Sequence, residues 1–328
     1  MSFEMFITFI QQSIRLSSTL LLGSTGEIIT EKSGNLNLGT PGIMASGAIS
    51  GIVGAYFYTT SGVAFNPVIS IILTIACCII FSLLTTLIYC FLTITLKTNQ
   101  NVTGLALTTF GIGISNFIGS IINGKMGGTG VAAFPEIGKA YRTPLPFADK
   151  LGVFGDIFLS YGFMTYFAII IAILVAFIIT RTRIGLNLRA VGENPATADA
   201  AGINVGTYKY IATLIGGVIS GLGGLYYVMD FAAANWQNNI LDQFGWLSVA
   251  LVIFAVWRPN LAILGAIAFG ALYVIGPFFL ELSSKDQELL KILPYLVTII
   301  VLVFVSIRDK KENQPPASLG LSYFREER

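Results

Sequence analysis

One interval of the sequence restricts the possible folds more than any other feature. No Asp, Glu, Lys or Arg occurs from Ser33 to Leu96, a run of 64 residues. A soluble domain has about 25% charged residues, whereas this chain has 11% charged and 54% hydrophobic residues. Because a membrane-spanning helix needs about 20 apolar residues, the run predicts two spans. Ser61-Gly62 and Asn66-Pro67 supply the turn between them.

Further charge-free stretches extend this pattern along the chain. A first apolar segment covers about 5–29, and later ones cover 98–124, 157–180, 210–229, 243–257, 259–280 and 292–307. The sequence therefore predicts an all-α, polytopic membrane helical bundle of about nine spans. We assign residues 1-310 to this transmembrane domain and residues 311-328 to a charged cytoplasmic tail.

The distribution of Lys and Arg predicts the orientation of the bundle. With the N-terminus outside, twelve basic residues fall on the cytoplasmic side, including Arg181, Arg183 and Arg189, and six fall outside. Cytoplasmic loops carry the excess of basic residues in membrane proteins. We therefore expect a multi-pass protein of the plasma (inner) membrane, with its N-terminus outside and its C-terminus in the cytoplasm. The first segment is the least regular span, since Arg15 and Glu27 interrupt it.

Composition excludes several functional classes. Histidine is absent, which excludes Ser-His-Asp and Cys-His catalysis and His-based zinc motifs. Cys77, Cys78 and Cys90 lie in one apolar run and are expected to be packing residues. The net charge of +2 does not favour nucleic-acid binding. We expect no metal and no cofactor.

A segment that matches the start of a phosphate-binding loop does not change this expectation. Residues 119–126 (GSIINGKM) fit the glycine and lysine spacing, but Met126 replaces the hydroxyl residue that would hold magnesium. The segment also ends a span and does not join a strand to a helix. The chain itself is therefore not expected to hydrolyse ATP or to be an enzyme.

The polar loop over residues 181–206 contains the most informative local pattern. Asn194-Pro195 is typical of a helix start, with Asn at the N-cap and Pro at the first helical position. Gly202 suits the position that ends a helix. The pattern predicts a short helix over about 195–201. This helix either transmits force from a partner that grips it or is a passive connector on the membrane surface.

Residues 181–205 (RTRIGLNLRAVGENPATADAAGINV) resemble the coupling segment of permeases from bacterial ABC importers of the branched-chain amino acid and ribose type. The matching positions are Thr182, Arg183, Gly185, Gly192, Asn194, Ala198, Gly202 and Ile203. The resemblance implies a short cytoplasmic coupling helix that docks on a separate ATPase subunit. The ATPase-coupling residues that it implies are Gly185, Arg189, Gly192, Glu193, Asn194, Ala198 and Gly202.

Two further segments resemble the nucleoside (simple sugar-like) branch of this family. They are residues 31–44 (EKSGNLNLGTPGIM) and the tail over 314–328. The glycines and Pro41 predict a broken second helix, whose free backbone groups would line a cavity. Asn35 and Asn37 then either face the pathway or cap a hydrated helix start.

The resemblance implies the permease subunit of an ATP-binding cassette importer that carries nucleosides into the cytoplasm. Its implied partners are an ABC ATPase subunit, a second permease subunit forming a heterodimer, an extracytoplasmic substrate-binding lipoprotein and the lipid bilayer. Candidate translocation-pathway residues are Asn35, Asn37, Asn116 and Trp236, each of which also has a structural interpretation.

Two alternatives to this function stay open. The same machinery could import a simple sugar or a branched-chain amino acid, or the chain could be an ATP-independent secondary carrier or channel. The small number of ionisable residues in the spans favours ATP-driven transport over ion coupling. The G-x-x-x-G pairs Gly47/Gly51 and Gly217/Gly221 are expected to pack helices within the bundle.

Overall fold

Five helices in the computed structural model begin at a residue whose side chain caps them. The model describes residues 3–324 except 129, 147, 280–283 and 309–313. The Asn66 side chain accepts hydrogen bonds from the backbone at the start of one helix, and Asn99, Thr182, Asn194 and Asn204 each do so at the start of another. A cap of this kind satisfies backbone N–H groups that have no partner inside the helix.

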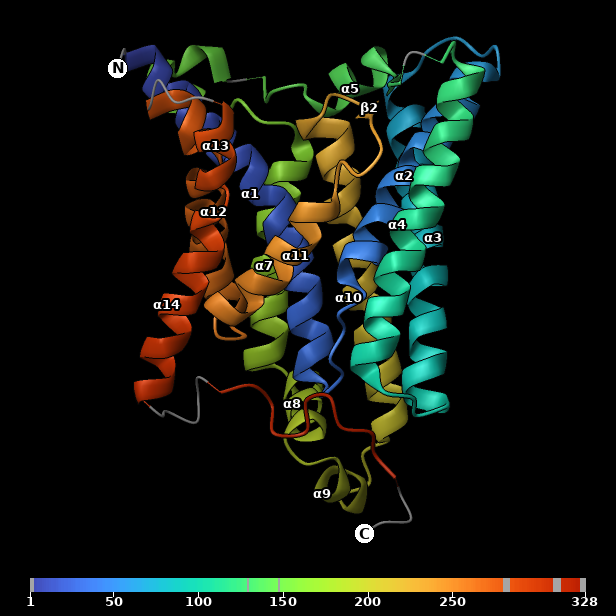
Figure 1. Cartoon of the computed structure of the whole chain (residues 1–328), viewed down its shortest axis with the longest axis vertical. Coiled ribbons are helices and arrows are strands. Elements are labelled where there is room, and N and C mark those ends of the chain that lie inside the picture. The colour runs from blue at the N-terminus through green and yellow to red at the C-terminus, as the bar shows by residue number, and fades with distance from the viewer. Residues whose placement is uncertain (1–2, 129, 147, 280–283, 309–313, 325–328) are drawn as a thin grey trace.

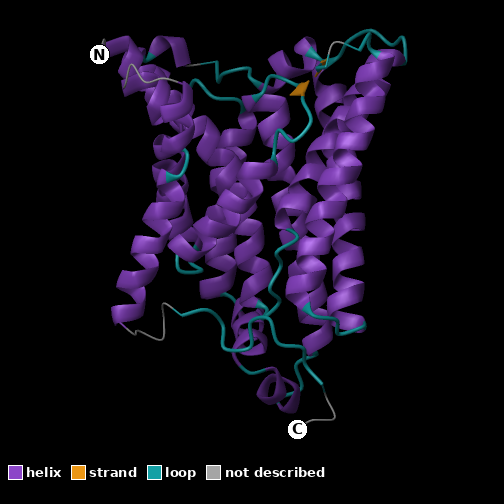
Figure 2. Ribbon diagram, in the orientation of Figure 1, coloured by secondary structure: helices purple, strands orange, loops and turns teal. Residues whose placement is uncertain are grey.

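The described residues form a helical bundle with one minimal β-ladder (Figure 1; Figure 2). The long helices are α1 (Phe3–Lys32), α2 (Thr40–Thr60), α3 (Pro67–Cys90, continued by the π-helical Phe91–Thr95), α4 (Gln100–Lys125), α7 (Phe163–Arg181), α10 (Val205–Tyr226, continued by the π-helical Tyr227–Phe231), α11 (Asp242–Phe254), α12 (Pro259–Phe279) and α14 (Leu293–Arg308). The short elements are α5 (Pro135–Tyr141), a 3-10 turn (Ala148–Lys150), α6 (Gly152–Phe158), α8 (Arg183–Glu193), α9 (Pro195–Ala200), α13 (Ser284–Leu290) and the paired strands β1 (Ala132–Ala133) and β2 (Asn235–Trp236).

Six helical segments among the described residues are long and apolar enough to cross a membrane. They are Pro67–Thr95, Gln100–Lys125, Phe163–Arg181, Val205–Phe231, Pro259–Gly276 and Asp286–Phe304. The expected all-α polytopic membrane bundle is thereby confirmed. The expected count of nine spans is not confirmed. Although α1 and α2 are long enough, they are not among these apolar segments, and α11 has only 13 residues.

The prediction of a break inside the second helix is also not confirmed. From Thr40 to Thr60, α2 is continuous, and the non-helical backbone is the segment 33–39 before it. Figure 2 shows this segment as a loop that runs between helices in the lower part of the bundle. Pro41 lies in the first turn of α2, where its missing N–H costs nothing.

The centre of the bundle is built from α1, α2 and α10, and small residues set how closely these helices pack. Most of the membrane-spanning stretch of α10 is buried, whereas only a minority of the residues in α3, α4 and α14 are buried. A Cβ atom added at Gly47 of α2 would lie 2.5 Å from the carbonyl oxygen of Gly221 of α10. The G-x-x-x-G residues at this crossing therefore pack helices of the same chain, as expected.

The two termini lie at opposite ends of the bundle (Figure 1). The N-terminus is at the end that carries α5 and β2, and the C-terminal residues are at the end that carries α8 and α9. The predicted boundary between the membrane domain and the tail falls among residues 309–313, outside the described residues. Residues 314–324, which we call the strap, lie against the α8–α9 end.

Candidate functional site

The predicted coupling segment forms two short helices that project from one end of the bundle (Figure 1). In α9, Asn194 Oδ1 accepts a hydrogen bond from the Thr197 N–H at 3.0 Å, and Pro195 occupies the first turn. Gly202 follows the last turn with φ of +85°, a conformation that favours glycine. The predicted helix over about 195–201 is confirmed as Pro195–Ala200. Sequence reasoning missed α8.

Small residues of the coupling segment are buried against the bundle. A Cβ atom on Gly185 would lie 2.1 Å from the Ile178 carbonyl oxygen at the end of α7. One on Gly192 would lie 2.3 Å from the Lys32 carbonyl oxygen at the end of α1. Ala198 is also buried, in a small apolar cluster with Val191 and Val205. These three predicted residues therefore attach the segment to the membrane helices.

The other predicted coupling residues point outward. Arg189, Glu193, Asn194 and Gly202 are exposed. They present one cation, one anion and polar backbone at the end of the molecule, a surface suited to a polar partner. The coupling segment thus has an inner face that packs on α1 and α7 and an outer face that is exposed and accessible to another protein.

The strap holds the coupling segment from the side. The Ser318 N–H donates to the Gly192 carbonyl at 3.0 Å, and the Ser318 hydroxyl donates to the same oxygen at 2.5 Å. The Gly320 N–H donates to the Gly34 carbonyl at 3.3 Å. Because Gly34 has φ of +82° and lies against Ser318, this crossing needs glycine. The strap, the end of α8 and the start of segment 33–39 therefore meet at one point.

Farther along, the strap contacts elements on both sides of the bundle. The Tyr323 hydroxyl donates to the Asp199 carboxylate of α9 at 2.9 Å. The Lys97 ammonium, between α3 and α4, lies 4.2 Å from the centre of the Phe324 ring, a favourable cation–π geometry. The strap thereby links α9 to the α3–α4 hairpin.

Segment 33–39 contains two of the predicted pathway residues, and both are buried. The Asn35 amide donates to the Thr213 hydroxyl of α10 at 3.3 Å, while Asn35 Oδ1 has no hydrogen-bond partner among the described residues. The Asn37 side-chain oxygen accepts from the Gly39 N–H at 3.0 Å, and the Asn37 N–H donates to the Glu27 carboxylate at 3.2 Å. Asn37 therefore has a local structural role, whereas Asn35 keeps an unused acceptor.

Two glutamates of α1 are buried, which the sequence argument about few ionisable groups did not foresee. Glu27 and Glu31 are 1% and 3% exposed. The Thr40 hydroxyl donates to Glu27, and the Trp257 indole N–H donates to Glu31. Both carboxylates thus fix chain segments that border α1. Their four-residue spacing on one helix face is the signal that could have identified them as a pair.

The remaining predicted pathway residues lie toward the opposite end of the bundle. Asn116 of α4 and Asn239 form two hydrogen bonds, at 2.5 and 2.9 Å. Trp236 is 2% exposed and packs on Gly119, where a Cβ atom would lie 1.9 Å from the indole nitrogen. Both residues therefore tie α4 to the segment before α11, and the structure groups them apart from Asn35 and Asn37.

This arrangement is suited to transmitting movement. The part of the chain that the structure describes contains no cluster of three or more His, Cys, Asp or Glu side chains that could hold a metal. The coupling segment instead connects rigidly to the ends of α1 and α7, and through the strap to α3 and α4. A force applied to the outer face of α8 and α9 would therefore act directly on α1 and α7, and through the strap on α3 and α4.

Comparison with known families gives one match over most of the chain. Residues 9–302 match the family described as branched-chain amino acid transport system permease component. The matched region includes α2 to α13 in full, α1 from residue 9 onward and α14 up to residue 302.

Individual relatives agree with this family. The chain is 31% identical to the guanosine ABC transporter permease protein NupQ of Bacillus subtilis, with 95% of each chain covered. It is 32% identical to the nucleoside ABC transporter permease protein NupC of Lactococcus lactis, covering 87% of this chain and 88% of that one. It is also 31% identical to a putative glucose ABC transporter permease protein, TsgC13, of Haloferax volcanii, with 96% of each covered. No solved structure matches.

Proposed function

Because the chain belongs to the family of permease components of branched-chain amino acid transport systems, we propose that it is the membrane subunit of an ATP-driven importer whose cargo is nucleosides. The observation that carries this proposal is the capped helix α9 with its outward-facing partner surface, set between α7 and α10. The guanosine and nucleoside permeases among its relatives support the cargo.

The proposed mechanism is rigid-body movement of helices. An ABC ATPase subunit grips the outer face formed by Arg189, Glu193, Asn194 and Gly202. When ATP closes the ATPase dimer, α8 and α9 move, and the contacts of Gly185 and Gly192 with the membrane helices pass the movement on. The pathway then alternates between outward and inward access.

Our proposed topology has nine crossings, with the N-terminus outside and the C-terminus in the cytoplasm. The six apolar spans plus α1, α2 and α11 make nine. At 1.5 Å per residue, the 30 residues of α1 extend about 45 Å, enough for a tilted crossing. The second crossing is the broken one, with the extended segment 33–39 followed by α2. Residues 1–310 then form the membrane domain and 311–328 the tail.

Nucleosides are neutral and offer a stacking face, so their pathway needs amide, hydroxyl and aromatic groups more than charges. Asn35, which is buried beside α10 and donates to the Thr213 hydroxyl, is the residue we place in the pathway. Asn37, Asn116 and Trp236 border it, and their contacts shape its walls.

The proposed partners are an ATPase, a second permease and an extracytoplasmic binding lipoprotein. The nucleoside permease NupB of Lactococcus lactis, 24% identical over 43% of this chain, is a second relative from the organism that has NupC. This pairing supports a heterodimer. The exposed apolar faces of α3 and α4 are available for lipid or for the second permease.

Copurification and transport assays test the ATP-driven mechanism. We expect an ATPase to copurify from the native membrane and uptake to stop when ATP is depleted. A secondary carrier would instead purify without an ATPase, keep transporting without ATP and stop when the ion gradient collapses. That result would reject the proposal.

Competition assays test the cargo separately. Uptake of labelled guanosine should be reduced by excess unlabelled nucleoside and unaffected by glucose or leucine. The glucose permease among the relatives makes a sugar the alternative. Competition by glucose, with none by any nucleoside, would replace the cargo but keep the ATP-driven machinery.

A further inference from the structure

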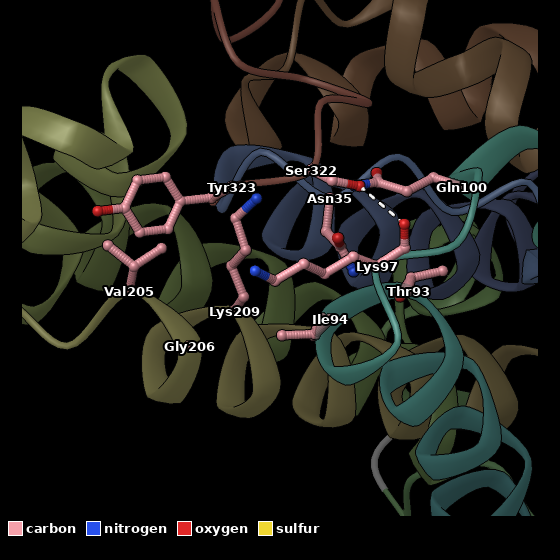
Figure 3. Close-up of a pocket in the computed structure, with 10 residues that line it drawn as sticks. All are labelled: Asn35, Thr93, Ile94, Lys97, Gln100, Val205, Gly206, Lys209, Ser322 and Tyr323. Carbon is pink, nitrogen blue, oxygen red and sulfur yellow. Dashed lines mark hydrogen bonds between the residues drawn. The ribbon is translucent and has the colours of Figure 1, made fainter. Parts of the chain in front are cut away.

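A cavity of about 200 Å³ lies beneath the strap, where segment 33–39, the α3–α4 hairpin and the start of α10 meet. Its lining residues are Asn35, Thr93, Ile94, Lys97, Gln100, Val205, Gly206, Lys209, Ser322 and Tyr323 (Figure 3). Two of these ten residues are lysines and none is acidic.

The buried lysine is the unusual group in this cavity. Lys209 of α10 is 4% exposed, and its ammonium makes one long hydrogen bond, 3.5 Å to the Leu321 carbonyl of the strap. No carboxylate forms an ion pair with Lys209 within the described residues. Burying a charge is costly unless it is paired. Among the described residues, Lys209 has no partner of opposite charge to offset this cost.

A second cation reaches the same space from the other side. In Figure 3 the Lys97 side chain runs from the α3–α4 hairpin into the cavity, toward Lys209. Lys97 has φ of +54°, an uncommon conformation for a residue other than glycine. The Ser322 hydroxyl donates to the Lys97 carbonyl at 3.5 Å. Two lysines that line one small cavity repel each other unless an anion lies between them.

We propose that this cavity binds a phosphate group, held between Lys97 and Lys209 and covered by Ser322 and Tyr323. Lysine is a common ligand for phosphate, acting as a point charge. Asn35 Oδ1, which has no partner among the described residues, suits the one O–H donor of a free hydrogen phosphate ion, a donor that a lipid phosphodiester lacks. The group comes either from a free phosphate ion or from the headgroup of an anionic lipid.

Binding of such an anion would stabilise the strap on the bundle. The Lys209 ammonium contacts the strap at the Leu321 carbonyl, and the Lys97 ammonium contacts it at the Phe324 ring. The Lys97 backbone carbonyl adds a hydrogen bond from the Ser322 hydroxyl. The cavity is thus a place where the cytoplasmic anion content or the lipid composition can act on the segment that holds α8 and α9.

The test measures the Tm of the purified transporter complex in lipid nanodiscs without nucleotide. In discs of phosphatidylcholine, inorganic phosphate should raise the Tm of the wild type by about 2 °C in a saturable way, relative to sodium chloride of equal ionic strength. If the headgroup is the source, the Tm should already be higher in discs that contain phosphatidylglycerol without added phosphate. Added phosphate should then cause no further increase in the Tm.

Three variants make the result specific. Lys209→Met and Lys97→Gln should each abolish the shift, while Lys139→Gln, at an exposed lysine near the opposite end, should keep it. Phosphate bound by the ATPase would instead raise the Tm of the wild type and of all three variants equally. If Lys209→Met does not fold, Lys97→Gln still tests the proposal, because Lys97 is exposed and its substitution should not disturb the fold.

The proposal is overturned if neither phosphate nor phosphatidylglycerol shifts the wild type, or if the shift survives in both lysine variants. It is also overturned if the response appears only after Glu326→Gln and Glu327→Gln are combined, since the tail would then supply the anion itself. Transport plays no part in these measurements, so their failure leaves the importer function untouched.

Discussion

Neighbouring residues in the coupling segment have different tasks. Gly192 is buried, and any side chain there would press against the end of α1, whereas Glu193 is exposed beside it. Substitution of Gly192 by a large residue such as Trp would therefore disturb the attachment of α8 as well as docking. A charge reversal at Glu193 changes the outer face and leaves the packing of α8 in place. It also removes a 3.4 Å hydrogen bond from the Ala317 N–H and the attraction between the Glu193 carboxylate and Lys32 at the end of α1.

Glu193→Arg should uncouple ATP hydrolysis from transport. Losing a charge contact at the ATPase interface costs at least about 1.4 kcal/mol, so uptake should fall about tenfold. The Tm of the permease should stay within about 2 °C, because the side chain is exposed. Parallel assays of uptake and ATPase activity in proteoliposomes check this. Glu136→Arg, at an exposed glutamate of α5, is the matched control; equal uptake in both variants would contradict the docking role.

Glu27 should stabilise the fold through the hydrogen bonds that it accepts and not through its charge. Glu27→Ala removes the acceptor for the Asn37 N–H and the Thr40 hydroxyl. Leaving buried donors unpaired costs about 1–3 kcal/mol each, so the Tm should fall by about 4 °C or more. Glu27→Gln keeps an acceptor and should stay near the wild type. Glu4→Ala, at an exposed position of the same helix, should have no effect. A Gln variant as unstable as the Ala variant would show that the charge is needed.

At the scale of elements, the strap is the feature that joins the others. It contacts α8 through Ser318, α9 through Tyr323 and the α3–α4 hairpin through Phe324. None of these elements is close to the strap in the sequence. We therefore expect the strap to restrict any movement of α8 and α9 relative to the α3–α4 hairpin.

Removal of the strap should loosen the coupling segment. Deletion of residues 314–328 removes the hydrogen bonds to Gly192 and Asp199. Amide hydrogen exchange in α8 and α9 should become at least about tenfold faster, the factor that corresponds to about 1.4 kcal/mol. Exchange in α5, at the other end, should not change.

Single substitutions at two serines of the strap test its contact with α8 without removing the whole strap. Ser318→Ala loses the short hydrogen bond to Gly192, whereas Ser322→Ala loses only a 3.5 Å bond to Lys97. The first variant should therefore raise exchange in α8, and the second should not. Equal exchange in the two variants would mean that the strap contact does not hold the segment.

These elements also show what sequence reasoning can reach. The local signals Asn194-Pro195 and Gly202 predicted α9 to within a residue, because caps act over one turn. The first apolar segment was predicted to end at about residue 29, and α1 ends at Lys32. The break predicted inside the second helix is not confirmed, because α2 is continuous and the non-helical segment lies before it. The contacts of Glu27 with Thr40, Lys209 with Leu321 and Asn116 with Asn239 could not be predicted, since they depend on how distant helices pack.

For the whole molecule, the bundle has a buried centre and an exposed periphery. The buried α10 lies among α1, α2 and α3, while α3, α4 and α14 carry many exposed large hydrophobic side chains. A chain with such a surface needs lipid or other membrane subunits around it. The coupling segment and strap occupy one end, and α5 with β2 the other (Figure 1).

The final prediction concerns which end faces the cytoplasm. In a background without Cys77, Cys78 and Cys90, of which Cys77 is partly exposed, single cysteines are placed at opposite ends by Asn194→Cys and Lys139→Cys. A membrane-impermeant maleimide should label only the cysteine at 139 in right-side-out vesicles and only the one at 194 in inside-out vesicles. This follows from the excess of Lys and Arg on the α8–α9 side.

Both positions are exposed, so accessibility of the side chain does not limit the labelling. Opposite labelling of the two cysteines also requires an odd number of crossings between them, as the proposed topology has. Labelling of the cysteine at 194 from outside would place α9 where no cytoplasmic ATPase could grip it. The proposed coupling mechanism would then fail, because the force of ATP hydrolysis is generated on the other side of the membrane.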